Sequence, residues 1–410
     1  MSAQEAARWL GVKPATLYAY VSRGLLKSVP GRGRARLYAR AELERLRARA
    51  SRGGDATPST TRGQWVSDAL AWGEPVLESA ITEIGPAGPR YRGVDAVALV
   101  ESGARFEDVA ERLWGAGGQG GWDTRELGVR ASAITALVPR EAPPLVALSV
   151  LVPALGALDQ ARWDTSPKAV AARARVLVRR MAAGLALGGA AETVKDALEA
   201  DTVAGTIATA MGARRGRDGV SAIDRALVAI ADHELNVSTF AARVAASGGA
   251  DLYACVTAAL AALSGPRHGG ACDRIEAMSD EAETNVGHAR DPKEKARHVI
   301  DARARRGDPI PGFEHPLYPS GDPRSPPLLA IAEAIGSRER RVETLRAIVD
   351  VMRARGRQPT VDVALVTMAA ALGMPAGAAT GVFAVGRTAG WVAHVLEQQA
   401  TGVMLRPRGR

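Results

Sequence analysis

Residues 360–398 read TVDVALVTMAAALGMPAGAATGVFAVGRTAGWVAHVLEQ, and this stretch decides the fold class. It consists mainly of apolar residues and alanine, the strongest helix former, with a break rich in glycine and proline at 373–377. The whole chain shares this character, because 47% of its 410 residues are hydrophobic and only 4% are aromatic, and strand-like runs of Val, Ile, Thr and Tyr are scarce. We therefore expect an all-α fold of closely packed helices without internal repeats.

Two charged residues stand out in this stretch. Asp362 opens an apolar helix, and a carboxylate there is expensive to bury unless it has a partner or a chemical role. The alternative is that Asp362 merely caps the helix N-terminus. Arg387 lies on a nearly uncharged helix, on the same face as Trp391 and His394, and a cation in such surroundings requires an anion.

A glycine-rich turn upstream carries a histidine. The sequence predicts helices over 239–247 and 252–263, then the stretch SGPRHGGACD at 264–273, with a new helix from Gly270. His268 would stand just before that helix N-terminus, whose partial positive charge keeps the imidazole neutral and able to donate a hydrogen bond. The neighbouring glycines would let a ligand approach the backbone closely. A purely structural turn is the alternative.

A second histidine lies in another stretch dense in glycine and proline. Residues 310–324 read IPGFEHPLYPSGDPR and contain His315 and, nine residues later, Arg324. A loop this long inside a helical domain is usually functional. This stretch therefore adds His315 and Arg324 to the candidate functional residues.

The basic charge is confined to the N-terminus. Residues 1–52 contain 12 Lys and Arg against 3 Asp and Glu, whereas the remaining residues contain 41 of each, so the whole excess of +9 belongs to this segment. Residues 51–64 are rich in Gly, Ser, Thr and Arg without periodicity, as is typical of a flexible linker. We therefore expect a small basic domain over 1–50 and a second domain over 65–410.

The basic domain has the pattern of a helix-turn-helix. Ser2 and Glu5 have capping-box spacing, Gly11 ends the first helix, and a second helix follows over 14–23. PGRGRARLYARAELERL, residues 30–46, then predicts a basic hairpin and a third helix. The segment resembles the winged helix-turn-helix of the MerR and excisionase type.

That resemblance implies binding to double-stranded DNA, with residues 14–23 as the recognition helix. The implied contacts are Thr16, Tyr18, Tyr20 and Arg23 from this helix and Arg32, Arg34 and Arg36 from the wing. The alternative is a solvated basic face on a small oligomerisation domain.

The second domain resembles citrate synthase. DHELNVSTF, GPRHGGA, PGFEHPLYPSGDPR, TVDVAL, FAVGRTAGWVAHVLEQ and RPR occur in the order and spacing of that family, and YRGVDAVALVESGARFEDVAERLW at 91–114 is similar to its N-terminal region. The resemblance implies a large helical domain and a small one, here over about 270–375, that closes over the substrates.

The resemblance also implies roles for individual residues. Asp362 would remove a proton from the methyl carbon of acetyl-CoA, His268 would stabilise the resulting enol, and His315 would polarise and protonate the keto group of oxaloacetate. The dianion oxaloacetate would be bound by His233, Arg324, Arg387 and Arg406, the last from the partner subunit of a homodimer.

Four positions depart from common members of the family: Ile230, Cys272 in place of a common asparagine, Glu314 and Pro316. They concern substrate preference and turnover, and they leave two alternatives open. One is a 2-methylcitrate synthase that uses propionyl-CoA. The other is a transcription regulator whose synthase-like domain only senses its ligand.

We expect neither a metal site nor a permanently bound cofactor, since acetyl-CoA and CoA would be substrate and product. With two cysteines there is no disulfide framework, and the N-terminus lacks the apolar stretch of a signal peptide. A cytoplasmic protein without membrane association is therefore expected.

Overall fold

The computed structural model describes most of the second domain and part of the first. The described residues are 2–10, 28–30, 36–39, 77–115, 120–139, 141–189, 191–284 and 291–407, with Leu17, Val21, Leu26 and Leu43 as single positions. They fall into two compact units, one up to Glu78 and one from Ser79.

The N-terminal unit contains one described helix and a strand pair. Helix α1 (Ala3–Leu10) starts with the predicted capping box, in which the Ser2 N–H donates to Glu5 Oε2 at 2.8 Å and the Glu5 N–H donates to Ser2 Oγ at 3.3 Å. Strands β1 (Ser28–Pro30) and β2 (Arg36–Tyr38) pair antiparallel, as expected for the wing hairpin. The unit has its own small core, formed by Ala6, Ala7, Leu17, Leu26, Tyr38 and Leu43.

The second unit is mostly helical, as predicted. Its strands are β3 (Thr82–Gly85), β4 (Gly88–Tyr91) and β5 (Val94–Asp95). Its helices are α5 (Ala96–Ser102), α6 (Phe106–Trp114), α7 (Ala131–Thr135), α8 (Pro144–Leu158), α9 (Pro167–Gly184), the 3-10 helix η1 (Leu185–Gly188), α10 (Ala191–Leu198), α11 (Val203–Ala210), α12 (Gly216–Ile230), α13 (Val237–Ser247), α14 (Leu252–Leu263), α15 (Ala271–Thr284), α16 (Pro292–Arg306), α17 (Ser325–Gly336), α18 (Arg340–Ala354), α19 (Val361–Ala371) and α20 (Ala378–Thr401).

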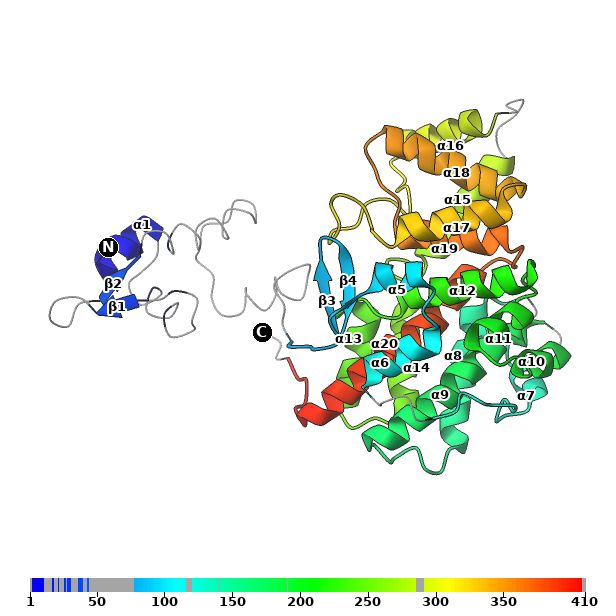
Figure 1. Ribbon diagram of the computed structural model, residues 1–410, viewed down its shortest axis with the longest axis horizontal. Coiled ribbons are helices and arrows are strands. Elements are labelled where there is room, and N and C mark those ends of the chain that lie inside the picture. The colour runs from blue at the N-terminus through cyan, green and yellow to red at the C-terminus, as the bar shows by residue number, and fades with distance from the viewer. Residues whose placement is uncertain are drawn as a thin grey trace. The chain divides into compact units, whose positions relative to one another are not determined.

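Helix α20 is the centre of the unit (Figure 1). It packs against α6, α8, α9, α12, α13, α14, α15 and α19, and most of its residues are buried. Two glycines allow α12 to come close. A Cβ at Gly386 would lie 2.8 Å from a side-chain carbon of Ile230, and one at Gly390 would lie 2.2 Å from an oxygen of Asp232. The end of α12 is therefore held directly against α20.

Helices α15 to α19 gather on one side of the unit, in the upper part of Figure 1. Among them, α16 packs on α18, α17 on α19, and α15 on both α18 and α19. This group coincides in sequence with the small domain expected over about 270–375. Helix α19 also packs against α20, so the group remains in contact with the central helix.

The structure departs from the sequence prediction in two details. The three-stranded antiparallel sheet β3-β4-β5 was not expected in an all-α domain. Helix α13 begins at Val237, two residues earlier than predicted, because the Asn236 side chain accepts the Thr239 N–H at 3.1 Å and caps it. Within the described part of the chain, no helix combines the length and apolar character needed to cross a membrane.

Candidate active site

Six of the seven predicted site residues lie on segments that converge beside α20. His233 follows α12, His268 lies in the turn between α14 and α15, and His315 lies in the loop before α17. The other three are Arg324 at the N-cap of α17, Asp362 in the first turn of α19 and Arg387 in the middle of α20.

His233 and His315 form the first part of the cluster. Their ring centroids are 5.3 Å apart at a near-perpendicular angle. The Tyr318 hydroxyl lies 2.8 Å from Nε2 of His233, and its ring is 5.0 Å from that of His315. Burial, together with the charges of Arg324 and Arg387, holds the pKa of His233 well below its usual value. His233 is therefore a neutral imidazole.

His315 is held in one tautomer by its own loop. The Leu317 N–H donates to Nδ1 of His315 at 3.2 Å, so the proton of the neutral ring lies on Nε2. Burial, followed by the charge of Arg324, lowers the pKa of His315. The loop is itself fixed to the segment before α19, because the Thr360 N–H donates to the Gly312 carbonyl at 2.8 Å and the Glu314 N–H to the Gln358 carbonyl at 3.1 Å.

The two buried arginines differ in how their charge is balanced. Arg324 forms a bidentate pair with Asp322, at 2.9 Å and 2.8 Å, but its third nitrogen, Nη1, is buried without a partner among the described residues. Arg387 donates from Nε to the Ile230 carbonyl at 2.7 Å and lies over the Phe383 ring at 4.7 Å. No carboxylate in the described chain lies within ion-pair distance of Arg387, and burial lowers its pKa to about 10. Both guanidinium groups thus retain N–H donors for an anionic ligand.

His268 is held by the side chains behind it. Its Nε2 lies 2.8 Å from Ser238 Oγ, which accepts the Trp391 indole N–H at 3.1 Å and in this structure donates to Asn236 Oδ1 at 2.8 Å. The single hydroxyl proton can be donated either to Asn236 or to His268, and only the second choice leaves the imidazole proton on Nδ1. The tautomer of His268 therefore depends on Ser238.

The predicted neutrality of His268 agrees with the structure, but the main cause is different. Burial, followed by the charge of Arg387, lowers the pKa of His268 to about 4. The adjacent glycines, which we expected to open the backbone to a ligand, also have a packing role. A Cβ at Gly269 would lie 2.4 Å from the Leu263 carbonyl oxygen, and one at Gly270 would lie 2.9 Å from Cα of Pro266. These glycines are required by close packing of the turn on itself.

Asp362 does not cap its helix, so that alternative was wrong. The N-cap of α19 is Thr360, whose hydroxyl donates to Oδ2 of Asp362 at 2.9 Å. The other carboxylate oxygen, Oδ1, is 3.8 Å from the Cys272 sulfur. The carboxylate is therefore held from both sides and remains only partly buried.

A buried network supports the site from behind. Nε2 of His394 lies 3.3 Å from Oδ2 of Asp232, the residue before His233. Burial acts to raise the pKa of Asp232, but His394 and Arg387 outweigh it and the pKa is lowered. Asp232 is thus an anion, and it anchors the end of α12 to α20.

Sequence reasoning missed several residues that the structure adds to the site. They are Ser238 and Asn236 behind His268, Tyr318 on His233, Asp322 on Arg324, and Phe383, whose ring centroid is 6.3 Å from that of His268. All five lie inside motifs that the sequence analysis quotes. Their polar or aromatic side chains within those motifs could have identified them as members of the site.

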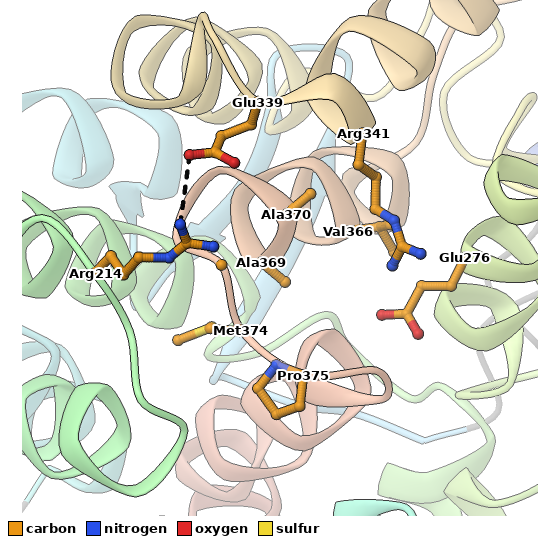
Figure 2. Close-up of a pocket in the computed structure, with 10 residues that line it drawn as sticks. Arg214, Glu276, Glu339, Arg341, Val366, Ala369, Ala370, Met374 and Pro375 are labelled. Carbon is orange, nitrogen blue, oxygen red and sulfur yellow. Dashed lines mark ion pairs between the residues drawn. The ribbon is translucent and has the colours of Figure 1, made fainter. Parts of the chain in front are cut away.

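A charged cavity lies elsewhere on α19 (Figure 2). Its volume is about 230 Å³, and its lining combines Val366, Ala369 and Ala370 of α19 with the charged groups Arg214, Glu276, Glu339 and Arg341 and the segment Gly373–Pro375. It contains none of the predicted site residues. We place the chemistry in the histidine and arginine cluster, because that is where the unpaired donors converge.

The remaining predicted residues lie apart from this cluster. Arg406 is exposed in the tail after α20, and none of the described hydrogen bonds or ion pairs joins it to the cluster. Arg36 lies in β2, opposite Pro30. Thr16, Tyr18, Tyr20, Arg23, Arg32 and Arg34 are outside the described residues.

Comparisons with known proteins give the same assignment for both parts of the chain. Residues 70–408 match the model of the "Citrate synthase, C-terminal domain" family, and residues 1–51 match that of a "Helix-turn-helix domain". "Citrate synthase 2" of Bacillus subtilis is 30% identical over 78% of this chain and 88% of its own length. "2-methylcitrate synthase 1" of Corynebacterium glutamicum is 34% identical over 46% of this chain and 49% of its own length.

A solved structure has the same fold. It is the ternary complex of citrate synthase from Thermoplasma acidophilum with carboxymethyl coenzyme A and oxaloacetate, with a TM-score of 0.68 and 24% identity. The match covers 82% of this chain and 93% of that one.

Proposed function

The chain belongs to the citrate synthase family and is an enzyme of that type, and we propose that it condenses acetyl-CoA with oxaloacetate and water to give citrate and CoA. One observation carries this proposal. Arg324 and Arg387 present unpaired N–H donors beside two neutral histidines, which suits a small dianion with a carbonyl group between its carboxylates.

In the proposed reaction Asp362 takes a proton from the methyl carbon of the acetyl thioester. The electron pair of that C–H bond moves towards the thioester carbonyl and forms the enolate, whose oxygen accepts a hydrogen bond from Nδ1–H of His268. That tautomer requires Ser238 to donate to Nε2. A neutral imidazole suits this task, because a thioester enol and a neutral imidazole are both very weak acids.

The methyl carbon then attacks the keto carbon of oxaloacetate. The π electrons move to the keto oxygen, which takes the proton from Nε2 of His315 and becomes the hydroxyl of citryl-CoA. The proton that Asp362 took from the methyl carbon is then released and restores neutral His315, so both groups return to their starting states. Water hydrolyses the thioester, and citrate and CoA are released. Closure of the helices α15 to α19 over the substrates would exclude water until the carbon–carbon bond has formed.

Release of CoA from acetyl-CoA in the presence of oxaloacetate tests the proposal directly. Cys255 and Cys272 are both buried, so a thiol reagent reports free CoA with little background. Asp362→Asn should lower kcat by roughly 10² to 10⁴. Asp350→Asn is the matched control, because it makes the same substitution at a partly exposed aspartate of α18. The Asp350 carboxylate pairs with Lys293 of α16. Turnover of the unmodified chain no higher than that of Asp362→Asn would refute catalysis and favour a ligand sensor.

A second candidate substrate is propionyl-CoA, because a 2-methylcitrate synthase is among the similar proteins. The two acyl groups differ by one methylene, which changes binding by only about 1–3 kcal/mol in an apolar pocket. Comparing kcat/KM for acetyl-CoA and propionyl-CoA decides between them. A higher value for propionyl-CoA would replace the proposed product with 2-methylcitrate.

We also propose a homodimer in which Arg406 completes the site of the partner subunit. Val237 on α13 and Val403 and Met404 in the tail are each at least 60% exposed, and such apolar surface is typical of an interface. Coexpressed Arg406→Ala and Asp362→Asn chains test this. A mixed dimer regains one intact site if Arg406 acts across the interface, and stays inactive if it acts within its own chain.

The helix-turn-helix domain leads us to propose DNA binding through residues 1–50. Two such domains in a dimer would read a roughly palindromic site, and binding should weaken steeply with salt. Mobility-shift assays on the gene's own upstream DNA test this with and without residues 1–52. Equal affinity of the two forms would refute the proposal.

A further inference from the structure

Cys272 lies between the two groups that the proposed function assigns to acetyl-CoA. It is the second residue of α15, four positions after His268. Its sulfur is 3.8 Å from Oδ1 of Asp362, and its side chain is 1% exposed. This contact between the Cys272 sulfur and Oδ1 joins α15 to the carboxylate of Asp362.

The surroundings of this carboxylate are otherwise accounted for. Thr360 donates to Oδ2 from the same segment. The charged and titratable groups that act on Asp362 from other elements are His315 in its loop, Arg387 on α20 and Cys272 on α15. Of these, Cys272 alone contacts Oδ1 in the described structure.

We propose that Cys272 is a positioning residue that fixes Oδ1 of Asp362 through a weak thiol donor. This inference rests on the proposed function, because it concerns the group assigned there as the base. It answers a question of chemistry: a base that removes a very weakly acidic C–H proton needs a defined orientation and a high proton affinity at the same time.

A thiol meets both needs. An S–H group is a weak donor, whereas an amide or hydroxyl donor to a carboxylate forms a strong charge-assisted hydrogen bond. Hydrogen bonds to the ionised form stabilise it and lower its proton affinity. The asparagine that many family members carry at this position would therefore make Asp362 a weaker base. Burial, and then the charge of Asp362, raises the pKa of the Cys272 thiol well above its usual value, so the proton needed for this contact remains on the sulfur.

The test compares the pH dependence of kcat/KM in two variants with opposite expectations. Cys272→Asn adds a strong donor, so the acid limb should move to lower pH by roughly half a unit to one unit, and kcat should fall about three-fold. Cys272→Ala removes the donor, so the acid limb should move to higher pH by roughly 0.3 to 0.5 units. Cys255→Ala is the matched control, because Cys255 is equally buried and its thiol donates to the Ala250 carbonyl, away from Asp362.

Opposite shifts in the two variants, with no shift in the control, support the inference. An acid limb that stays unchanged in both, or moves the same way in both, overturns it, since loss of packing alone would lower kcat without that pattern. A second readout needs no turnover: the carbon-13 NMR titration of the Asp362 carboxyl, assigned by its loss in Asp362→Asn, should shift in the same two directions. If Asp362→Asn retains full turnover, the proposed base fails, while the NMR titration still decides the contact.

Discussion

Removal of the charge of Arg387 should weaken oxaloacetate binding without destabilising the empty protein. Arg387 is 2% exposed and is held by one backbone carbonyl and one aromatic face, with no carboxylate partner in the described chain. A buried cation in this state destabilises the fold, as expected if the proposed site uses it to bind an anion. Arg387→Met keeps the length and apolar contacts of the side chain and deletes the charge.

The magnitude follows from the pKa of the guanidinium. Burial lowers this pKa from its ordinary value to about 10, although Asp232 acts in the opposite direction. At 1.36 kcal/mol per pH unit, the ligand-free fold disfavours the charged form by about 3 kcal/mol. Loss of an anion's charge-assisted partner costs about 2–5 kcal/mol, so kcat/KM for oxaloacetate should fall by roughly 30-fold to 5,000-fold.

Thermal denaturation followed by circular dichroism, with and without oxaloacetate, checks both halves of the prediction. Oxaloacetate at 100 times its Kd should stabilise the unmodified protein by about 2.7 kcal/mol, and this stabilisation should vanish in Arg387→Met. The Tm of the ligand-free variant should equal or exceed that of the unmodified protein, because the unpaired charge is gone.

Arg243→Met is the matched control. Arg243 is also 2% exposed, but it pairs with Glu397 at 2.7 Å and with Gln398 at 3.0 Å. Its removal leaves these partners uncompensated and should lower Tm by several degrees. A ligand-free Arg387→Met protein that is destabilised as much as Arg243→Met would refute the reasoning, since Arg387 would then be a structural residue.

Three further predictions concern the neighbouring groups. Ser238→Ala removes the hydroxyl that sets the tautomer of His268, so kcat should fall by roughly 10-fold in steady-state kinetics with little change in KM for oxaloacetate. Tyr318→Phe removes the hydroxyl 2.8 Å from His233, and KM for oxaloacetate should rise about five-fold, whereas an unchanged KM would exclude this positioning role. The pKa of His268 is about 4 in the fold against 6.5 for the ordinary group, so its contribution to stability is complete above pH 6.5 and is lost as the pH falls towards 4. His268→Gln should therefore recover about 2 kcal/mol of stability at pH 5 relative to pH 8, measured by urea denaturation at the two pH values.

The sequence predicted the helical class from strong local signals, and it predicted the grouping of the site residues through the resemblance to a known family. Alanine-rich apolar stretches predict helices directly. Asp362 and Arg387 stood out because charges are rare on apolar helices, and the structure brings their segments to the same cluster. The helical class and the unusual charges depend on residue type and position alone, so the sequence predicts them without any knowledge of tertiary contacts.

The rest depends on which side chains meet across the fold. The sequence contains Cys272 and Asp362, 90 positions apart, with nothing to link them until α15 packs on α19. The same holds for Tyr318 and His233. Local reasoning also assigned the glycines after His268 to ligand access, without showing that Gly269 packs closely against the Leu263 carbonyl. Long-range packing decided each of these points.

Asp322 shows why the site behaves as one unit. Its two oxygens bind Arg324, and Oδ2 also accepts the backbone N–H of Val361 at 3.1 Å. One carboxylate therefore fixes an arginine of the proposed oxaloacetate site and the first residue of the helix that carries Asp362. Because the His315 loop is joined to the same segment through Thr360, movement of any one of these groups displaces the others. In the proposed function, the orientations of the keto acid and of the base would thus be coupled within helices α15 to α19, and loss of the Asp322 carboxylate should lower turnover although Asp322 does not contact Asp362.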